Sequence, residues 1–319
     1  MIDLRSDTLT KPTPGMLAAM AAAEVGDEQY REDPTVNELQ RRMAELLGHE
    51  AALFVPTATM ANQIALRAQT TPGSPLVAEE RTHVVVYEAG GPAIHSGLMV
   101  RALPGEEGRL TPEQIEAEPD LGPGGMVVLE NTHRSSGGRV WRPDELRAAV
   151  DAAHAKGAKL HLDGARLFNA SVASGSAPSE WSRHADSVTI CFSKGLACPL
   201  GAVVAGTAAM IERAWEGKFL FGGAMRQAGV VAAAALYALD HHVDRLAEDH
   251  ARARLIDPDA ETNFAVIEDG PGLQAELRDR GLLVGNLRPG WLRAVTYLGV
   301  TDEDAERAAA ILGEVRVRA

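Results

Sequence analysis

The chain has 319 residues, of which 45% are hydrophobic, and a formal net charge of −13 at pH 7. This length predicts about two domains with a sizeable core, and the negative charge argues against nucleic acid and anionic membranes as main partners. Two cysteines, Cys191 and Cys198, are too few for a disulfide framework or a clustered zinc site, and the sequence contains no secretory or membrane-length apolar run. We therefore expect a cytoplasmic protein without a metal site.

The first clear element is a helix after residue 33. In the stretch DPTVNELQRRMAELLG, a capping box formed by Thr35 and Glu38 predicts the start of the helix, and Gly48 predicts its end. The apolar residues that share one helical face are Val36, Leu39, Met43 and Leu46.

Short apolar runs alternate with helical patterns along the rest of the chain, which is typical of an α/β protein with a mostly parallel sheet. A helical pattern at residues 142–157 illustrates the elements between the strands. The expected strands are residues 51–56, 126–131, 158–164, 187–192 and 201–206.

A long alanine-rich helix is expected at about residues 225–251. The turn-rich segment IDPDAETN follows it, which favours a domain boundary near residue 252. We therefore predict a large domain of residues 1–251, which includes the N-terminal segment, and a smaller C-terminal α/β domain of residues 252–319.

Chemically useful residues follow several expected strands, at the ends where open parallel sheets bind ligands. Asp163 and Arg166 lie at the end of one strand, and Lys194 follows another. Thr57 and Thr59 begin a helix whose first amides would attract an anion. His133 also follows a strand.

Each of these residues also has an ordinary structural explanation. Arg166 could be solvated after a simple turn, Thr57 could cap a helix, and Lys194 could extend its ammonium into water. His83 and His133 could be structural or surface histidines, and His161 fits core packing better than a metal site. The combination is harder to explain in this way, because pyridoxal 5′-phosphate requires a Schiff-base lysine, a carboxylate on its ring nitrogen and a phosphate cup.

The chain also resembles the low-specificity L-threonine aldolases. These belong to the β-eliminating lyase/threonine aldolase family of fold type I, aspartate-aminotransferase-like pyridoxal-phosphate enzymes. The resemblance spans nearly the whole chain. It is carried by the blocks DLRSDTLTKPT (3–13), VGDEQYREDPTVNELQ (25–40), FVPTATMANQIAL (54–66), THVVVYEAGG (82–91), LENTHRSSGGRV (129–140), LHLDGARLFNA (160–170), SVTICFSKGL (187–196), GGAMRQAG (222–229) and LRAVTYLGV (292–300).

For the cofactor, the resemblance implies that Lys194 forms the Schiff base, that Asp163 pairs with the pyridine nitrogen and that His83 lies against the ring. It also implies that the phosphate is bound by Thr57, Ala58 and Thr59, with Arg166 among the cofactor-binding residues. Ala58 stands where the family usually has glycine, and an added methyl can reshape the turn without removing its amides.

For the substrate, the resemblance implies that Ser6, Arg166 and Arg293 hold the carboxylate and that His133 faces the side chain. Glu88 is implied to lie near the same site. The resemblance further implies a homo-oligomer, a dimer with shared sites that pairs into a tetramer, in which Arg226 reaches the neighbouring subunit's phosphate. A phosphate contact by Lys218 is left open, because its spacing from Arg226 departs from the family pattern.

The reaction that the resemblance implies is cleavage of L-threonine, L-allo-threonine and related β-hydroxy-α-amino acids to glycine and an aldehyde. The general base remains open between a histidine and a water held by one. Two alternatives share parts of this sequence pattern. The first is β-elimination or aldol transfer with the same cofactor, and the second is a non-catalytic descendant that only binds.

Overall fold

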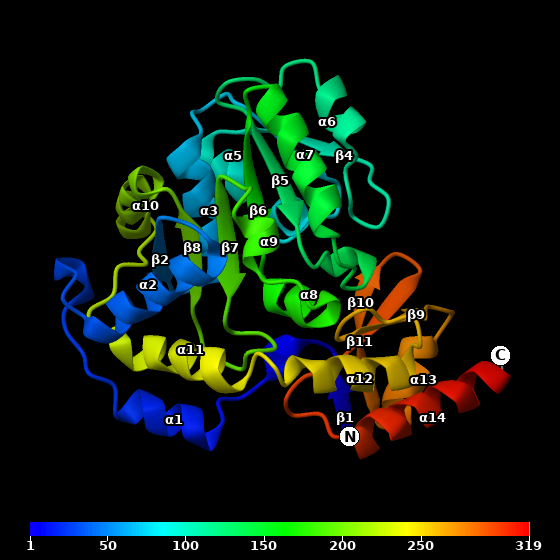
Figure 1. Cartoon of the computed structure of the whole chain (residues 1–319). Coiled ribbons are helices and arrows are strands. Elements are labelled where there is room, and N and C mark those ends of the chain that lie inside the picture. The colour runs from blue at the N-terminus through cyan, green and yellow to red at the C-terminus, as the bar shows by residue number, and fades with distance from the viewer. Residues whose placement is uncertain (319) are drawn as a thin grey trace.

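A computed structural model describes residues 1–318, and within that range the strands form two sheets (Figure 1). The larger sheet has seven strands in the order β2-β8-β7-β6-β5-β3-β4. These strands are β2 (Ala51–Val55), β3 (Pro75–Glu79), β4 (Met99–Leu103), β5 (Met126–Glu130), β6 (Lys159–Asp163), β7 (Ser187–Cys191) and β8 (Ala202–Gly206). Strands β3 to β7 pair in parallel, whereas β8 is antiparallel to both of its neighbours. The predicted α/β fold with a mostly parallel central sheet is confirmed.

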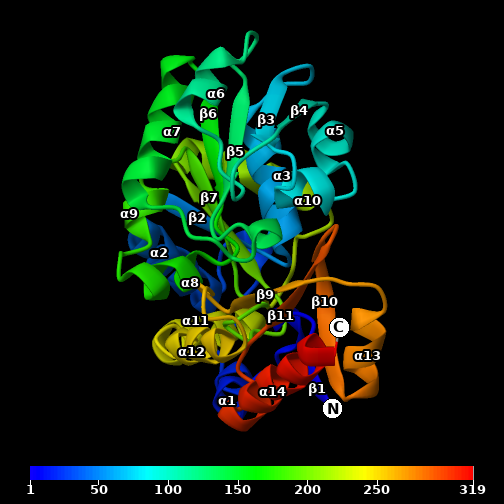
Figure 2. The ribbon, with the colours of Figure 1, turned by 90° about the vertical axis from the view of Figure 1, so that its right-hand side faces the viewer.

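The smaller sheet has four strands, within the described range, in the order β1-β10-β11-β9. They are β1 (Ile2–Leu4), β9 (Phe264–Glu268), β10 (Leu282–Arg288) and β11 (Trp291–Val295). Because β1 pairs in parallel with β10, the first residues of the chain join a sheet built from its C-terminal part (Figure 2). The predicted boundary near residue 252 falls within helix α12 (Leu246–Ile256), and the division into residues 1–251 and 252–319 stays a prediction.

Helices cover both faces of the large sheet (Figure 2). On one face lie α3 (Ala58–Gln69), α5 (Gly91–Ser96) and α10 (Ala208–Leu220), and on the other lie α2 (Pro34–Leu47), α7 (Pro143–Ala155) and α9 (Ser179–Ser182). The remaining helices are α1 (Pro14–Ala21), α4 (His83–Val86), α6 (Pro112–Ala117), α8 (Leu167–Ser174), α11 (Gly229–His241), α13 (Leu273–Asp279) and α14 (Asp302–Arg318), with short 3-10 turns η1 (Asp7–Leu9), η2 (Glu28–Tyr30) and η3 (Arg134–Ser136). Among the described residues, no helix combines the length and apolar character needed to cross a membrane. The expected cytoplasmic location stays a prediction.

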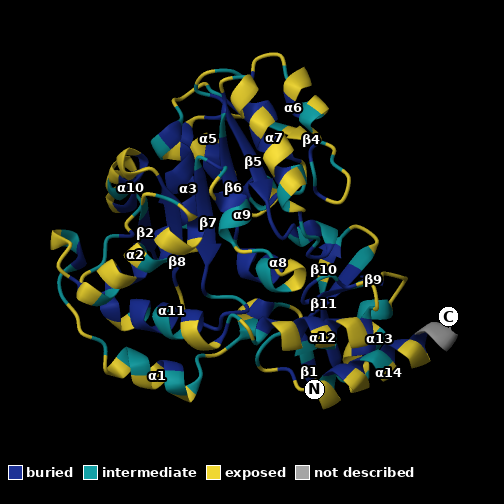
Figure 3. Cartoon of the chain, in the orientation of Figure 1, coloured by how far each residue is buried: buried dark blue, intermediate teal, exposed yellow. Residues whose placement is uncertain are grey.

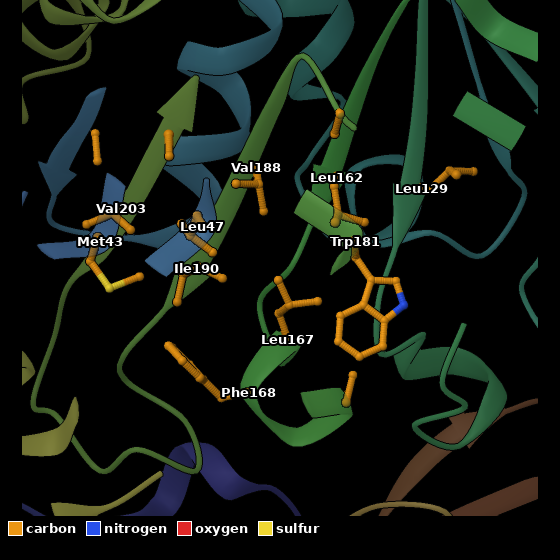
Figure 4. Packing of buried hydrophobic residues seen from close by; sticks show 14 of the residues in the cluster. Met43, Leu47, Leu129, Leu162, Leu167, Phe168, Trp181, Val188, Ile190 and Val203 are labelled. Atoms are coloured by element: carbon orange, nitrogen blue, oxygen red, sulfur yellow. The ribbon is translucent and has the colours of Figure 1, made fainter. Parts of the chain in front are cut away.

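The central strands are buried on both faces, which explains their nearly continuous apolar sequences (Figure 3). In β5, Val127 and Leu129 pack with the helices that include α2 and α7, while Met126 and Val128 face the opposite side. Leu129, Leu162, Leu167 and Trp181 belong to this core cluster (Figure 4). Cys191 and Cys198 are both buried free thiols.

Helix α2 begins at a different residue from the one predicted. Asp33 is its N-cap and accepts a hydrogen bond from an amide of the first turn (3.0 Å). The Thr35 hydroxyl donates instead to the Glu24 carbonyl (2.6 Å). The predicted capping box of Thr35 and Glu38 is therefore wrong, because an aspartate two residues earlier already satisfies the first turn. The predicted end at Gly48 is confirmed, with φ at 70°.

The long helix predicted at residues 225–251 is also wrong, because the structure has two helices there, α11 and α12. His242 follows α11, and its Nδ1–H donates to the Leu196 carbonyl (2.9 Å). The chain then turns before Leu246 begins α12. This tertiary contact connects the break between the helices to the loop that follows β7.

Candidate active site

The carboxyl ends of β2, β5, β6 and β7 lie at one edge of the large sheet. Strands β5, β6 and β7 are parallel, and β2 runs in the direction of β7 because both are antiparallel to β8. The predicted site residues that gather at this edge are Thr57 after β2, His133 after β5, Asp163 and Arg166 at the end of β6, and Lys194 after β7.

Asp163, the last residue of β6, is a buried carboxylate. Its Oδ2 accepts a hydrogen bond from Asn62 Nδ2 (2.8 Å), and its Oδ1 accepts one from the Ala165 amide (3.1 Å). Burial by itself would raise the pKa of Asp163, but the positive charges of His83 and Lys194 hold it below its ordinary value. Asp163 is therefore an anion at neutral pH, suited to pairing with a protonated ring nitrogen.

His83 and Glu88 form a second pair beside Asp163. His83 Nδ1 lies 2.8 Å from Glu88 Oε1, and the same carboxylate accepts hydrogen bonds from Asn62 Nδ2 (2.8 Å) and Gln63 Nε2 (2.5 Å). Burial lowers the pKa of His83, but Glu88 and nearby carboxylates raise it above its ordinary value overall. Polar atoms of His83, Glu88 and Asp163 all lie within 4.8 Å of one another. The hydrogen bonds account for this proximity, and the expected absence of a metal stays a prediction.

A chain of hydrogen bonds behind Asp163 fixes the orientation of Asn62. His161 Nε2 lies 3.0 Å from Asn62 Oδ1, and His161 Nδ1 lies 2.7 Å from the Ser187 hydroxyl, which also accepts from Gln69 Nε2 (2.7 Å). Because an amide oxygen can only accept, Nε2 of His161 carries the proton. Burial lowers the pKa of His161 to about 4. The neutral ring therefore turns the Asn62 amide group toward Asp163.

Lys194 lies in the turn after β7 and is half-buried. Its carbonyl accepts hydrogen bonds from the Thr10 hydroxyl (3.1 Å) and the Ala197 amide (2.8 Å). Its ammonium charge lowers the pKa of both Asp163 and Asp7. Lys194 is thus the charged residue of an otherwise apolar run, and its charge acts on two buried carboxylates of the site.

Two arginines enter the site, Arg166 after β6 and Arg293 from β11 of the smaller sheet. Their guanidinium carbons lie 4.9 Å and 5.5 Å from the ring centroid of Phe264. Arg166 Nε and Nη2 both donate to Asp7 (2.7 Å each); burial would raise the pKa of Asp7, but Arg166 and Lys194 lower it to about 2. Arg293 is buried, and its Nε and Nη1 find no hydrogen-bond partner within residues 1–318. A carboxylate ligand would satisfy these atoms.

The predicted phosphate-binding turn begins helix α3. Thr57 caps this helix, and its hydroxyl accepts a hydrogen bond from the Met60 amide (3.2 Å). Ala58 and Thr59 form the first turn, and both threonines are exposed. They line a cavity of about 540 Å³ whose other lining residues are Met60, Gln63, Arg67, Ile94, His95, Leu220 and Phe221. The amides of this first turn can bind an anion in that cavity.

His133 is completely buried at the start of η3. Its Nδ1 lies 2.9 Å from the Ser136 hydroxyl, and its Nε2 lies 3.2 Å from Glu79 Oε2. Within residues 1–318, Nδ1 has a hydrogen-bond partner, whereas Nε2 is close to Glu79 but makes no hydrogen bond. The contact with the substrate side chain that the resemblance implies stays a prediction.

Ser6 is half-buried and Arg226 is exposed, and each has a local partner. The Ser6 hydroxyl caps η1 by accepting a hydrogen bond from the Thr8 amide (3.3 Å). Arg226 Nη1 donates to Asp27 Oδ2 (3.0 Å), and the Arg226 side chain is 59% exposed. Their predicted contacts with the substrate carboxylate and with a neighbouring phosphate stay predictions.

Lys218 is completely buried in α10. Its Nζ donates to the Glu28 carboxylate and to the Phe54 carbonyl (2.7 Å to the latter). Burial lowers the pKa of Lys218, and Glu28 opposes that shift. Because the ammonium is enclosed by these two acceptors, Lys218 serves as a structural cation.

Replacing Glu28 by glutamine should lower the free energy of unfolding by about 3 kcal/mol, because it leaves the Lys218 ammonium buried without its counter-charge. Urea denaturation measures this change. The double variant Glu28→Gln, Lys218→Met removes the buried charge and should recover most of the loss. A loss below about 1 kcal/mol in the single variant would show that the pair behaves as an exposed one.

Comparison with known proteins agrees with this geometry. A family model described as "Beta-eliminating lyase" matches residues 3–276. The chain belongs to the beta-eliminating lyase family. "Low-specificity L-threonine aldolase 1" of Arabidopsis thaliana is 38% identical, over 95% of this chain and 93% of that protein. Among solved structures, threonine aldolase of Leishmania major matches with a TM-score of 0.84 at 19% identity, and the match covers 99% of both chains. A structure of SPT with PLP matches with a TM-score of 0.73 at 16% identity, and the match covers 99% of this chain and 87% of that one.

The predicted family and the predicted fold type I architecture are confirmed by these matches. The site of this beta-eliminating lyase family member also fits pyridoxal 5′-phosphate. Asp163 offers a buried anion for the ring nitrogen, Lys194 offers an amine for the aldehyde, and the start of α3 offers amides for the phosphate.

Sequence reasoning missed three residues of this site. Asp7 holds Arg166, Asn62 holds Asp163, and Gln63 holds Glu88. Asn62 and Gln63 did leave a signal, since they are two adjacent amides between apolar residues in the stretch MANQIAL (60–66). Such buried polar groups require partners.

Acidification between pH 6.5 and 4 should destabilise the protein. Burial holds the pKa of His161 near 4, below the ordinary value of about 6.5, so the unfolded chain binds a proton that the folded chain does not. The contribution of His161 to the free energy of unfolding is fully present above pH 6.5. About 3 kcal/mol of it is lost as the pH falls to 4. Urea denaturation from pH 7 to 4.5 measures the loss.

His250 should add to this dependence, because burial and the charges of Arg254 and Arg245 also lower its pKa to about 4. In a His250→Gln variant the free energy of unfolding should depend less steeply on pH, because the contribution of His250 is removed. A pH-independent free energy of unfolding across this range would contradict the prediction.

Proposed function

We propose that this protein is a pyridoxal-phosphate-dependent aldolase that cleaves L-threonine, L-allo-threonine and related β-hydroxy-α-amino acids to glycine and an aldehyde. The observation that carries the proposal is that Asp163 and Lys194 lie at one edge of the large sheet, while Arg293 of the smaller sheet lies near Arg166 and Asp7 with two buried nitrogens free for a ligand within residues 1–318. The names of relatives such as the Arabidopsis thaliana aldolase support the same reaction.

Bound pyridoxal phosphate supplies an aldehyde that combines with amines and a protonated ring that accepts the electron pair of a bond broken at the α-carbon. Asp163 keeps the proton on the ring nitrogen, since it is anionic and held in place by Asn62. Lys194 provides the amine that holds the cofactor covalently. Arg293, together with Arg166, binds the substrate carboxylate and so orients the Cα–Cβ bond for cleavage.

The position of His83 and its raised pKa suit a proton-transfer group. Its Nδ1 is bound to Glu88, so proton exchange with a ligand would occur at Nε2. The raised pKa of His83 favours proton uptake from the β-hydroxyl group as the bond breaks. Glu88 acts in this scheme as a positioning residue.

The test is to incubate the cofactor-loaded protein with L-threonine and to identify the products. Glycine and acetaldehyde in equal amounts support the aldolase proposal. A 2-oxo acid with ammonia would instead establish β-elimination, which the name of the family model keeps as the second candidate. No product with any β-hydroxy-α-amino acid would leave only a binding function.

We also propose that the protein forms dimers with shared active sites, which pair into tetramers. Apolar side chains at the phosphate-binding cavity are unusually exposed, with Ile94 at 73% and Leu220 at 61%. Such a surface beside a ligand cavity is typical of a subunit interface. Arg226 is exposed and can reach a neighbouring chain.

Mixed dimers should regain activity when one subunit carries Lys194→Ala and the other Arg226→Ala. If Arg226 acts across the interface, one of the two sites in each mixed pair has both residues intact. The two inactive variants are unfolded and refolded together, and cleavage of L-threonine is measured. Mixed pairs that form but stay as inactive as their parents would show that Arg226 acts within its own subunit.

A further inference from the structure

Arg134 brings another positive charge to the site, beyond the two arginines assigned to the substrate carboxylate. It begins η3, directly after His133. Its guanidinium carbon lies 4.1 Å from the ring centroid of Tyr87. The Tyr87 ring lies 5.5 Å, centroid to centroid, from the His83 ring. Arg134 is thus one aromatic ring away from the histidine at the centre of the site.

The guanidinium of Arg134 stacks on Tyr87 but donates no hydrogen bond to residues 1–318. Its Nη1 is buried and has no hydrogen-bond partner in the described part of the chain. The nearby Glu130 carboxylate is already used, because it accepts hydrogen bonds from the Arg134 amide (2.8 Å) and the His83 amide (2.7 Å). The Glu130 side chain therefore connects the main-chain amide that begins η3 to the one that begins α4.

Arg134 and Arg293 together leave an excess of positive charge. Burial lowers the pKa of Arg293, and the charges of Arg134 and Arg166 lower it further, to about 10. Asp7 neutralises Arg166, whereas no carboxylate lies within 4.0 Å of the side-chain nitrogens of Arg134 or Arg293 among residues 1–318. Two such guanidinium groups can bind two anionic groups of one ligand.

We propose that Arg134, positioned by Tyr87, binds an anionic group on the substrate side chain, so that the preferred substrates are β-hydroxy-α-amino acids with a second carboxylate, such as β-hydroxyaspartate. This inference rests on the proposed aldolase function. Cleavage breaks the Cα–Cβ bond and leaves its electron pair on the α-carbon, which gains a proton. The β-hydroxyl group loses its proton and becomes an aldehyde, so the products are glycine and glyoxylate.

Two substrates of equal size separate charge from shape: L-threo-β-hydroxyaspartate and its neutral amide, L-threo-β-hydroxyasparagine. We expect kcat/KM of the cofactor-loaded protein to favour the acid at least tenfold. Arg134→Gln should reduce that ratio at least tenfold, mainly through KM, and Arg134→Lys should retain part of it. Arg278→Gln, an exposed site on α13, is the matched control and should keep the ratio.

Binding of L-aspartate and L-asparagine, which lack the β-hydroxyl group, provides a readout independent of turnover. Calorimetry should find tighter binding of aspartate, and this preference should be lost in Arg134→Gln. Failure to cleave L-threonine and the two β-hydroxy acids would refute the aldolase proposal, while the aspartate preference would still support Arg134 as the anion-binding residue. Cleavage of L-threonine with equal treatment of acid and amide, or a preference that survives Arg134→Gln, would overturn the inference.

Discussion

Replacing Lys194 by alanine should reduce cleavage of L-threonine by about a thousandfold or more and abolish the visible absorption of the covalently held cofactor. Lys194 stands alone as a charge in an apolar run, and its ammonium acts on the buried carboxylates Asp163 and Asp7. Alanine removes the amine that holds the cofactor and that moves protons at the reacting carbon. Absorption spectra and a glycine assay on the purified variant measure both effects.

The fold should survive the Lys194→Ala substitution, because the backbone of the turn is held by the Thr10 hydroxyl and the Ala197 amide. Circular dichroism and thermal unfolding check this point. Lys11→Ala, at an exposed position, is the matched control and should keep both colour and activity. A Lys194→Ala protein that remains yellow and fully active would refute the assignment of the cofactor lysine.

The strands at the centre of the large sheet could be predicted because burial on both faces makes them continuous apolar runs, as in β5 and β7. Strands β3 and β4 were not predicted. Strand β3 is buried but has a proline and a glutamate at its ends, and the pattern of the edge strand β4 mixes exposed and intermediate residues around Arg101. The pairing of β1 with β10 was also not predicted. No local pattern records a contact between the two ends of a chain.

The same limit applies to the site. Asp163 and Lys194 could be predicted because they lie at or just after the carboxyl end of a strand. Ligands bind at these ends in an open parallel sheet. Asp7 could not, since its partner Arg166 is 159 residues away in the sequence. The unsatisfied guanidinium of Arg134 likewise depends on which carboxylates the fold places beside it.

Replacing Asp163 by asparagine should lower kcat for L-threonine by about 100- to 1000-fold, while part of the cofactor affinity is kept. Asparagine has the same shape but no charge, so it cannot keep a proton on the ring nitrogen, and electrons released at the α-carbon lose their acceptor. The effect should be larger on kcat than on cofactor binding, because the phosphate turn at Thr57 and the amine of Lys194 remain. Steady-state kinetics and cofactor titration separate the two.

A carboxylate elsewhere on the protein should tolerate the same change. Asp144→Asn, on the exposed start of α7, is the matched control, with kcat expected within twofold of the unmodified protein, because surface substitutions of this kind change stability by only about 0.5 kcal/mol. Asn62→Ala should lie between the two, since it removes one hydrogen bond to Asp163 but leaves the charges of His83 and Lys194 that hold its pKa low. Near-normal kcat in Asp163→Asn would mean that a different carboxylate pairs with the ring nitrogen.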